Sequence, residues 1–283
     1  MGYRNKSWIL DSKIILNMSR YYRTLIKPYL LDVYTGAQAA YSLRKLRSNY
    51  TGNCIQVRRS SDNATQNIGF VTNLVDTAAI SAFVGPTASG FVTRWYDQSG
   101  NGVDLIQNTA AKQAGIYAAG SFFYEGTDIV MDATSTNREF VRNTNTTVLT
   151  DWTIFNKSKM LNNYATYVGF AAATNGLLQH NVNGFDYYDG AAYRNIVGGG
   201  GFSTAYRKIG ARRISSTQTV RGYINGIAPS AGYTPIAVPL TLSTGCRFYG
   251  DFAGDGWRGT LREVIVYPTA LTDAQILAIN NLM

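Results

Sequence analysis

The stretch LREVIVYPTALTDAQILAI (Leu261–Ile279) decides the fold class of this 283-residue chain. Its first seven residues are strongly apolar and β-branched apart from Arg262 and Glu263, which predicts a buried strand, and Pro268 ends that strand. Thr272 and Gln275 then have the spacing of a capping box, followed by an apolar run at 276–279, which predicts a helix. A buried strand joined to one terminal helix indicates a β-rich domain with that helix packed on a sheet.

Short β-branched or aromatic runs, most of them bounded by Gly, Asn, Asp or Ser, recur from about residue 36 onward and predict many strands. The predicted strands are Cys54–Arg58, Gly90–Tyr96, Glu139–Arg142, Trp152–Phe155, Tyr164–Phe170, Leu177–Asn181, Ala205–Ala211, Thr217–Ile224 and Leu261–Tyr267. Asn225-Gly226 predicts a two-residue hairpin turn, because both turn positions need positive φ. The pattern predicts an all-β fold, a two-sheet antiparallel β-sandwich over residues 36–283 with a C-terminal helix as its one clear helix.

Residues 1–35 differ from the rest, with six basic residues against two acidic ones. A helical apolar stripe limited by Pro28 predicts a short amphipathic helix there, formed by Ile14, Met18, Tyr21, Leu25 and Tyr29. Because such a helix cannot bury its stripe alone, it packs either on its own domain or on a partner. The predicted organisation is therefore a basic docking segment, 1–35, followed by the sandwich domain.

The composition excludes several classes of protein. Charged residues make up only 15% of the chain, which excludes disorder by charge repulsion. No apolar stretch approaches the roughly 20 residues that span a bilayer, so no membrane span is predicted. The formal charge of +9 comes with no long basic run and no nucleic-acid motif, so nucleic acid is not a predicted partner. The N-terminus shows no secretory signal, which predicts synthesis in a cytoplasm.

The residue types needed for several kinds of catalytic or metal site are missing. His180 is the chain's single histidine, and no nucleophile-elbow motif accompanies it, so a Ser-His-Asp or Cys-His site is not predicted. Cys54 and Cys246 with one histidine have no zinc-ligand spacing. Free buried thiols are the favoured interpretation of the two cysteines, and a pair between neighbouring strands stays open. No cofactor is predicted, and calcium binding stays open.

Carboxylates remain as candidates. Asp186 and Asp189 flank Tyr187-Tyr188, and Asp251 and Asp255 lie in a glycine-rich loop. Paired carboxylates can hydrolyse glycosides, bind calcium, or simply form Asp-Gly turns, and the turn interpretation is favoured. Aromatic, Asn and Asp residues interleave in two loops, Phe185–Arg194 and Tyr249–Arg258. That mixture suits sugar recognition, since a ring covers a sugar face while polar groups bind its hydroxyls.

Three stretches carry a resemblance to a known family. They are Tyr41–Asn63 with VRRSSDN (Val57–Asn63), WYDQSGNGVDL (Trp95–Leu105), and GYINGIAPSAGYTP (Gly222–Pro235) continued by YGDFAGDGWRGTLREVIVY (Tyr249–Tyr267). Together they resemble the concanavalin A-like catalytic domain of the B-type α-L-arabinofuranosidases, and the ending also resembles laminin G-like domains. The resemblance implies a concanavalin A-like jelly roll over roughly residues 36–283.

The resemblance weakens at the family's catalytic residues. It implies that Asp251, in Gly250-Asp251, is the general acid. The family's nucleophile is the Glu of an Asp-Leu-Glu-Asn-Gly run, and the matching stretch (residues 172–176) places Thr174 there. One carboxylate without its partner cannot run the two-step retaining mechanism. Glu263 is the only Glu near this site. We expect it to have a structural role, facing solvent or pairing with an Arg.

A domain of this kind, with no secretory signal and a short basic N-terminal segment, also resembles the virion proteins of tailed bacteriophages. The resemblance implies a non-catalytic virion protein, a head or tail appendage with a lectin-like, glycan-binding domain. Its predicted sugar contacts are Asn175, Tyr187, Tyr188, Asp251 and Trp257. Its predicted partners are other virion proteins, through residues 1–35, and a host surface polysaccharide bound by many copies. The first alternative is an active glycoside hydrolase that uses Asp251 with Asp186 or Asp189. The second is a purely architectural capsid or tail decoration protein.

Overall fold

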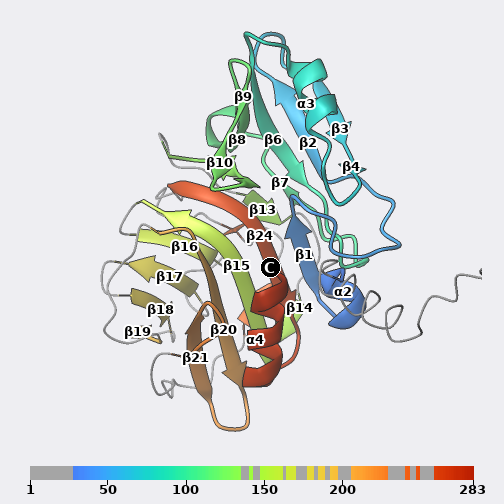
Figure 1. Cartoon of the computed structure of the whole chain (residues 1–283). Helices are drawn as coiled ribbons and strands as arrows, with labels where there is room; N and C mark the ends of the chain where they lie inside the picture. Colours follow the sequence, from blue (N-terminus) through green and yellow to red (C-terminus); the bar gives the residue numbers. More distant parts are fainter. Residues whose placement is uncertain are drawn as a thin grey trace, which may run out of the picture.

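The computed structural model describes eleven stretches of the chain: residues 28–134, 140–142, 147–161, 164–169, 177–181, 184–188, 192–196, 205–228, 240–242, 247–248 and 258–283. Within them, antiparallel strands form two layers, and helices pack against parts of these layers (Figure 1). The predicted β-sandwich is therefore confirmed. None of the helices in these stretches is long and apolar enough to cross a membrane.

The first layer is built around β24 (Gly259–Tyr267). On one side β24 pairs with β15, and the layer continues to β20 and β21. On its other side β24 pairs with two short strands, β1 and β12. The bounds are β15 Trp152–Met160, β20 Arg207–Ile214, β21 Thr219–Ile224, β1 Ala39–Ser42 and β12 Met131–Asp132.

The second layer begins with β3, β2 and β6, and β6 then pairs with both β7 and β8. From β7 it continues through β13, β23, β16, β17, β18 and β19. The bounds are β2 Ile55–Arg59, β3 Thr65–Ile68, β6 Ser89–Trp95, β7 Leu105–Ile106, β8 Gly115–Ala118, β13 Phe140–Arg142, β16 Tyr164–Gly169, β17 Leu177–Asn181, β18 Gly184–Tyr188, β19 Tyr193–Asn195 and β23 Arg247–Phe248.

Shorter elements complete the described fold. β9 (Ser121–Phe122) extends β8, and three two-stranded ribbons stand apart from the main sheet. The ribbons are β4 Phe70–Val71 with β5 Leu74–Val75, β10 Tyr124–Glu125 with β11 Asp128–Ile129, and β14 Thr147–Leu149 with β22 Leu240–Leu242. The helices are α2 Leu30–Val33, α3 Thr77–Val84, a 3₁₀ turn Ala110–Lys112, and α4 Asp273–Leu282.

Two hydrophobic cores lie on opposite faces of β24. Val264 and Val266 belong to the core between the layers, with Trp95 and Trp152, whereas Ile265 belongs to a second core on the outer face. In that second core Phe155 and Tyr267 pack with the apolar residues of α2 and α4, and α4 lies along this face of the sheet (Figure 1). All nine residues of β24 are consequently buried.

The local predictions at the C-terminal end are confirmed. The Thr272 side chain caps α4 and forms the capping box with Gln275. Asn225 and Gly226 have φ of 51° and 82°, and the flanking residues 224 and 227 exchange both backbone hydrogen bonds. A Cβ on Gly226 would lie 3.0 Å from Leu277, so the turn needs glycine for space as well as for its positive φ.

Other parts of the chain differ from the sequence prediction. α3 was not predicted, and α4 is therefore not the domain's one helix. Asp76 starts α3 by accepting a hydrogen bond from the Ala79 N–H at 2.9 Å. Leu30 and Leu31, at the end of the predicted docking segment, are buried in the second core. The rest of the predicted docking segment, residues 1–27, lies outside the described residues.

The WYDQSGNG motif has a structural role in this fold. Asp97 is buried, and its carboxylate accepts hydrogen bonds from the Ser99 hydroxyl and from the backbone N–H groups of Ala40, Ser99 and Val103. Gln98 is also buried, and its amide binds the backbone of Ser42, Arg44 and Leu46. The motif therefore ties the end of β6 to β1 and to the chain that follows it.

Glu263 forms a buried ion pair with Arg44, which confirms the expectation that it pairs with an Arg rather than facing solvent. Arg44 donates from Nε and Nη2 to its two carboxylate oxygens at 2.8 and 2.9 Å, and the Ser42 hydroxyl donates at 2.8 Å. Burial by itself would raise the pKa of Glu263, but the charge and hydrogen bonds of Arg44 hold it below its usual value. Cys54 is a free buried thiol, and burial raises its pKa. Cys246 lies outside the described residues.

We expect Glu263→Gln to lower the free energy of unfolding by about 3–5 kcal/mol, because it leaves the Arg44 guanidinium buried without its counter-charge. Urea denaturation at neutral pH measures this change. Asp62→Asn is the control, since it removes a carboxylate from the exposed Arg59–Asp62 pair and should have little effect. Equal stability of the two variants would contradict the role given to Glu263.

Candidate functional site

The structure describes only part of the predicted sugar-binding set. Asn175, Asp251 and Trp257 lie outside the described residues, as do Thr174 and Asp189. Tyr188 is described only as the last backbone position of β18, where it pairs with Leu177 and Tyr193.

Tyr187 is completely buried in the core between the layers. Its ring packs against Trp152 with 6.2 Å between ring centroids. The ring therefore stabilises the sandwich, and the prediction that Tyr187 contacts a sugar gains no support.

The described edge of the candidate site is the start of β24. The segment that carries Asp251 and Trp257 joins the sheet there, directly before residues 258–259. At this edge Gly259 pairs with Met160, the last residue of β15, and the next pair is Thr260 with Lys159. These paired strand ends fix the point at which the chain enters β24.

A hydrogen-bonded network holds this edge against the β10–β11 hairpin. Glu125 accepts a hydrogen bond from the Thr260 hydroxyl at 3.0 Å and pairs with Lys159 at 3.2 Å. On the facing strand of the hairpin, Asp128 pairs with both Lys157 and Arg262, each at 2.7 Å. The hairpin is thus fixed to β15 and β24 by four charged or polar contacts.

A β-bulge creates this arrangement. Lys157 pairs with Glu263 whereas Ser158 pairs with Leu261, so Arg262 is an extra residue on β24. A bulge lets two consecutive residues point to the same side of a sheet. Glu263 can then pair with Arg44 while Arg262 reaches Asp128.

The positive charges around Asp128 favour the ionised form of its carboxyl group. Burial would raise the pKa of Asp128, but the hydrogen bond from Lys157 and the charges of Arg262 and Lys157 lower it below its usual value. The Tyr206 hydroxyl donates to Asp128 at 3.2 Å, and burial, together with this carboxylate, raises the pKa of Tyr206. Asp128 is ionised at neutral pH and cannot act as a general acid, so the network positions the strand ends.

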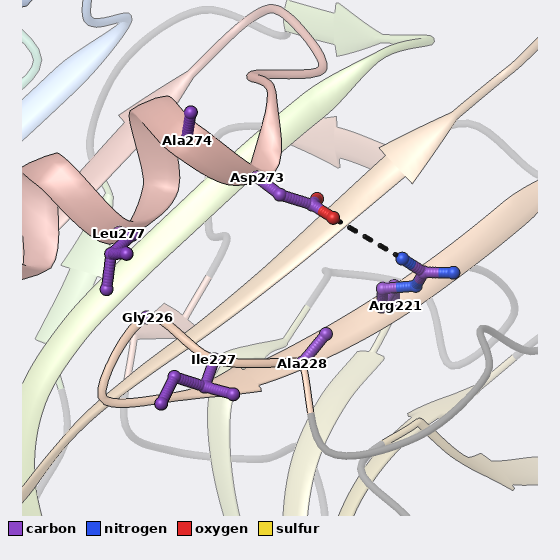
Figure 2. Close-up of a pocket in the computed structure, with 7 residues that line it drawn as sticks. All are labelled: Arg221, Gly226, Ile227, Ala228, Asp273, Ala274 and Leu277. Atoms are coloured by element: carbon purple, nitrogen blue, oxygen red, sulfur yellow. Dashed lines mark ion pairs between the residues drawn. The ribbon is translucent and has the colours of Figure 1, made fainter.

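A second charged cluster lies beyond the other end of β24, at the start of α4. Asp273 pairs with Arg212 at 2.7 Å and with Arg221 at 3.6 Å, and accepts a hydrogen bond from Tyr223 at 2.8 Å. Figure 2 shows the open pocket beside it, of about 530 Å³, between α4 and the hairpin turn at Gly226. Asp273 thus ties the start of α4 to β20 and β21.

The described stretches hold no cluster of three or more His, Cys, Asp or Glu side chains that could bind a metal ion. His180 is described only as a backbone position in β17. The described residues therefore give calcium binding no support. The segment around Asp251 lies outside them, so calcium binding there is not tested.

Comparison with known proteins identifies the family. Residues 31–195, more than half of the chain, match the sequence family described as "Alpha-L-arabinofuranosidase B, catalytic". The chain belongs to this family. No curated protein sequence matches the chain significantly.

Solved arabinofuranosidases share the fold. An arabinofuranosidase complexed with arabinofuranosyl-α-1,2-xylobiose has 17% identity and a TM-score of 0.60, and the match covers 89% of this chain and 63% of that one. A GH54 α-L-arabinofuranosidase soaked with a cyclic sulfate inhibitor has 18% identity and a TM-score of 0.58 over the same shares. The chain thus spans less than two thirds of the length of these enzymes.

The family match overturns the prediction of a non-catalytic virion protein, which was wrong. That prediction depended on Thr174 at one aligned position, on the absence of a secretory signal and on the short basic N-terminal segment. Membership of a catalytic-domain family favours the glycoside hydrolase alternative instead. The predicted partners and the predicted virion location are not tested by the described residues and stay predictions.

We expect Asp128→Asn to lower the free energy of unfolding at pH 7 by about 1–3 kcal/mol, because Lys157 and Arg262 lose their shared carboxylate. Since the pKa of Asp128 is lower in the folded state, its contribution is complete above the unfolded-state value near 3.9 and is lost as the pH falls through the folded-state value. Urea denaturation at pH 7 and pH 3 measures both. A difference between wild type and variant that is equally large at pH 3 would contradict this assignment.

Proposed function

We propose that the protein is a glycoside hydrolase that cleaves α-L-arabinofuranosyl linkages. The observation that carries this proposal is the family match over residues 31–195, a span that runs from α2 to β19 and contains the WYDQSGNG motif. The shared sandwich fold of the solved arabinofuranosidases supports it.

In this proposal Asp251 is the general acid, an assignment that follows from the resemblance of Gly250-Asp251 to the family's acid position. It protonates the glycosidic oxygen as the bond to the arabinofuranosyl carbon breaks. Its segment joins β24 at the edge fixed by the Glu125 and Asp128 contacts. A rigid strand end supports catalysis, because a general acid must lie within hydrogen-bond reach of the leaving oxygen.

A second carboxylate is needed as nucleophile or general base. Thr174 has none, so Asp186 and Asp189 are the candidates. Asp186 lies in β18, paired with Gln179 of β17 and Asn195 of β19, next to the core position of Tyr187. Asp186 is therefore proposed from its place in the sequence beside Tyr187, and Asp189 from its place two positions further on.

The test compares an activated and a natural leaving group. Asp251→Asn should lower release of arabinose from arabinoxylan about 10²-fold or more, with a smaller loss on 4-nitrophenyl α-L-arabinofuranoside, whose leaving group needs little protonation. Asp186→Asn or Asp189→Asn, whichever supplies the second carboxylate, should lower both rates. The measurements are reducing-sugar release and 4-nitrophenol absorbance.

Asp62→Asn is the matched control, an exposed Asp-to-Asn change in a turn away from these strands. Wild-type protein that releases arabinose from neither substrate would overturn the proposed function. Full activity of Asp251→Asn on arabinoxylan would instead remove Asp251 as the acid while leaving the activity in place.

A further inference from the structure

The outer face of β3, β2 and β6 is a polar surface that neither the fold nor the proposed chemistry requires. The inner face of these strands is covered by α3, whose Ile80 and Val84 pack with Val57 and Ile68. On the outer face, the register aligns Asn67 of β3, Gln56 of β2 and Arg94 of β6 in one row. Adjacent strands lie about 4.8 Å apart, close to the length of one sugar unit in a polysaccharide.

Hydrogen bonds hold the amides of this row in a fixed orientation. Asn67 Oδ1 accepts from Gln56 Nε2 at 3.0 Å and from the Tyr96 hydroxyl at 2.8 Å. Gln56 Oε1 accepts from Thr93, the extra residue of a bulge in β6, at 2.9 Å. Since Asn67 Oδ1 is the acceptor, its exposed Nδ2 group carries two donors with no partner among the described residues. Two fixed, exposed donors match the hydroxyl oxygens of a sugar.

Aromatic rings accompany the amides. The Arg94 guanidinium lies over the half-buried Tyr96 ring at 5.6 Å and pairs with Asp104 at 3.4 Å. In the next row, Arg58 lies over the Phe91 ring at 5.0 Å and donates to Gln113 at 2.7 Å. Both arginines thus hold a ring in place and already have a partner for their charge or donors.

Phe91 also opens onto a small pocket at the end of this face. The pocket, of about 180 Å³, is lined by Ser89, Phe91, Gly115, Tyr117, Ala118, Phe123 and Asp132. The register continues the row of Arg58 and Phe91 to Gly115 and then to Asp132. A Cβ on Gly115 would lie 3.1 Å from the Phe123 ring, so glycine is what lets this ring cover the pocket.

We propose that this face binds a stretch of neutral polysaccharide, and that the aromatic pocket receives one sugar unit or side branch of it. Rings, fixed amides and a carboxylate recognise hydroxyl-rich, uncharged chains. An anionic chain is disfavoured, because the arginines are already engaged and Asp104 and Asp132 flank them. The identity of the polysaccharide, an arabinofuranosyl-substituted one, rests on the proposed function.

Affinity electrophoresis of the full chain through gels containing arabinoxylan tests the proposal. The wild type should be retarded. Asn67→Ala should weaken binding about fivefold through loss of the paired donors, and Tyr96→Ala about tenfold through loss of the ring. The matched control is Gln66→Ala, an exposed amide next to Asn67 at the alternate position of β3. Thermal denaturation checks that each variant is folded.

The same variants are assayed on two substrates. With 4-nitrophenyl α-L-arabinofuranoside, kcat/KM should stay at the wild-type value, while KM for arabinoxylan rises and kcat stays unchanged. Retardation in the gel needs no hydrolysis, so binding without any activity would overturn the proposed function alone. Wild type that is not retarded, or Asn67→Ala that is retarded as strongly as wild type and Gln66→Ala, would overturn the binding face.

Discussion

The burial of β24 on both faces is the constraint on which the rest of the described structure depends. One face belongs to the core between the layers, the other to the core beneath α2 and α4. A polar side chain on such a strand must find its partner inside the protein. Glu263 does so with Arg44, which fixes β1 beside β24 and leaves the register little freedom. The bulge at Arg262 lets the same strand turn from this buried pair to the contacts of the β10–β11 hairpin.

Those contacts connect the core to the proposed chemistry. β24 is rigid along its length because both of its faces are packed, and its first residues are held by Glu125 and Lys159 from neighbouring elements. The Asp251 segment joins the sheet at this point. The strand that follows the proposed acid segment in the sequence is therefore held by packing and by half-buried ion pairs, which contribute more than fully exposed ones.

Local sequence patterns predicted the elements that are stabilised by residues close to one another in the sequence. The Thr272–Gln275 box and the Asn225-Gly226 turn each depend on a few neighbouring residues, and both formed as expected. Features that join distant residues could not be predicted in this way. Tyr187 lies in a loop-like sequence rich in Asp and Asn, yet its burial follows from Trp152 on another strand. The amide row of Asn67 is formed by three strands, and only the register brings its members together.

The function was predicted wrongly because one aligned position, Thr174, was given more weight than the family resemblance of the whole chain.

The strand on which the fold depends is also the last strand to be synthesised. It comes after every other strand of the domain, yet β1, β12 and β15 all pair with it. At about 5–20 residues per second, the ribosome needs roughly ten seconds or more to reach it after β1 has been made. Until β24 appears, β1 and later β12 and β15 each lack a pairing partner on one edge, and Arg44 next to β1 lacks its carboxylate. The β24 layer cannot close until this strand has been synthesised, so its unpaired edges are open to edge-to-edge association up to that point.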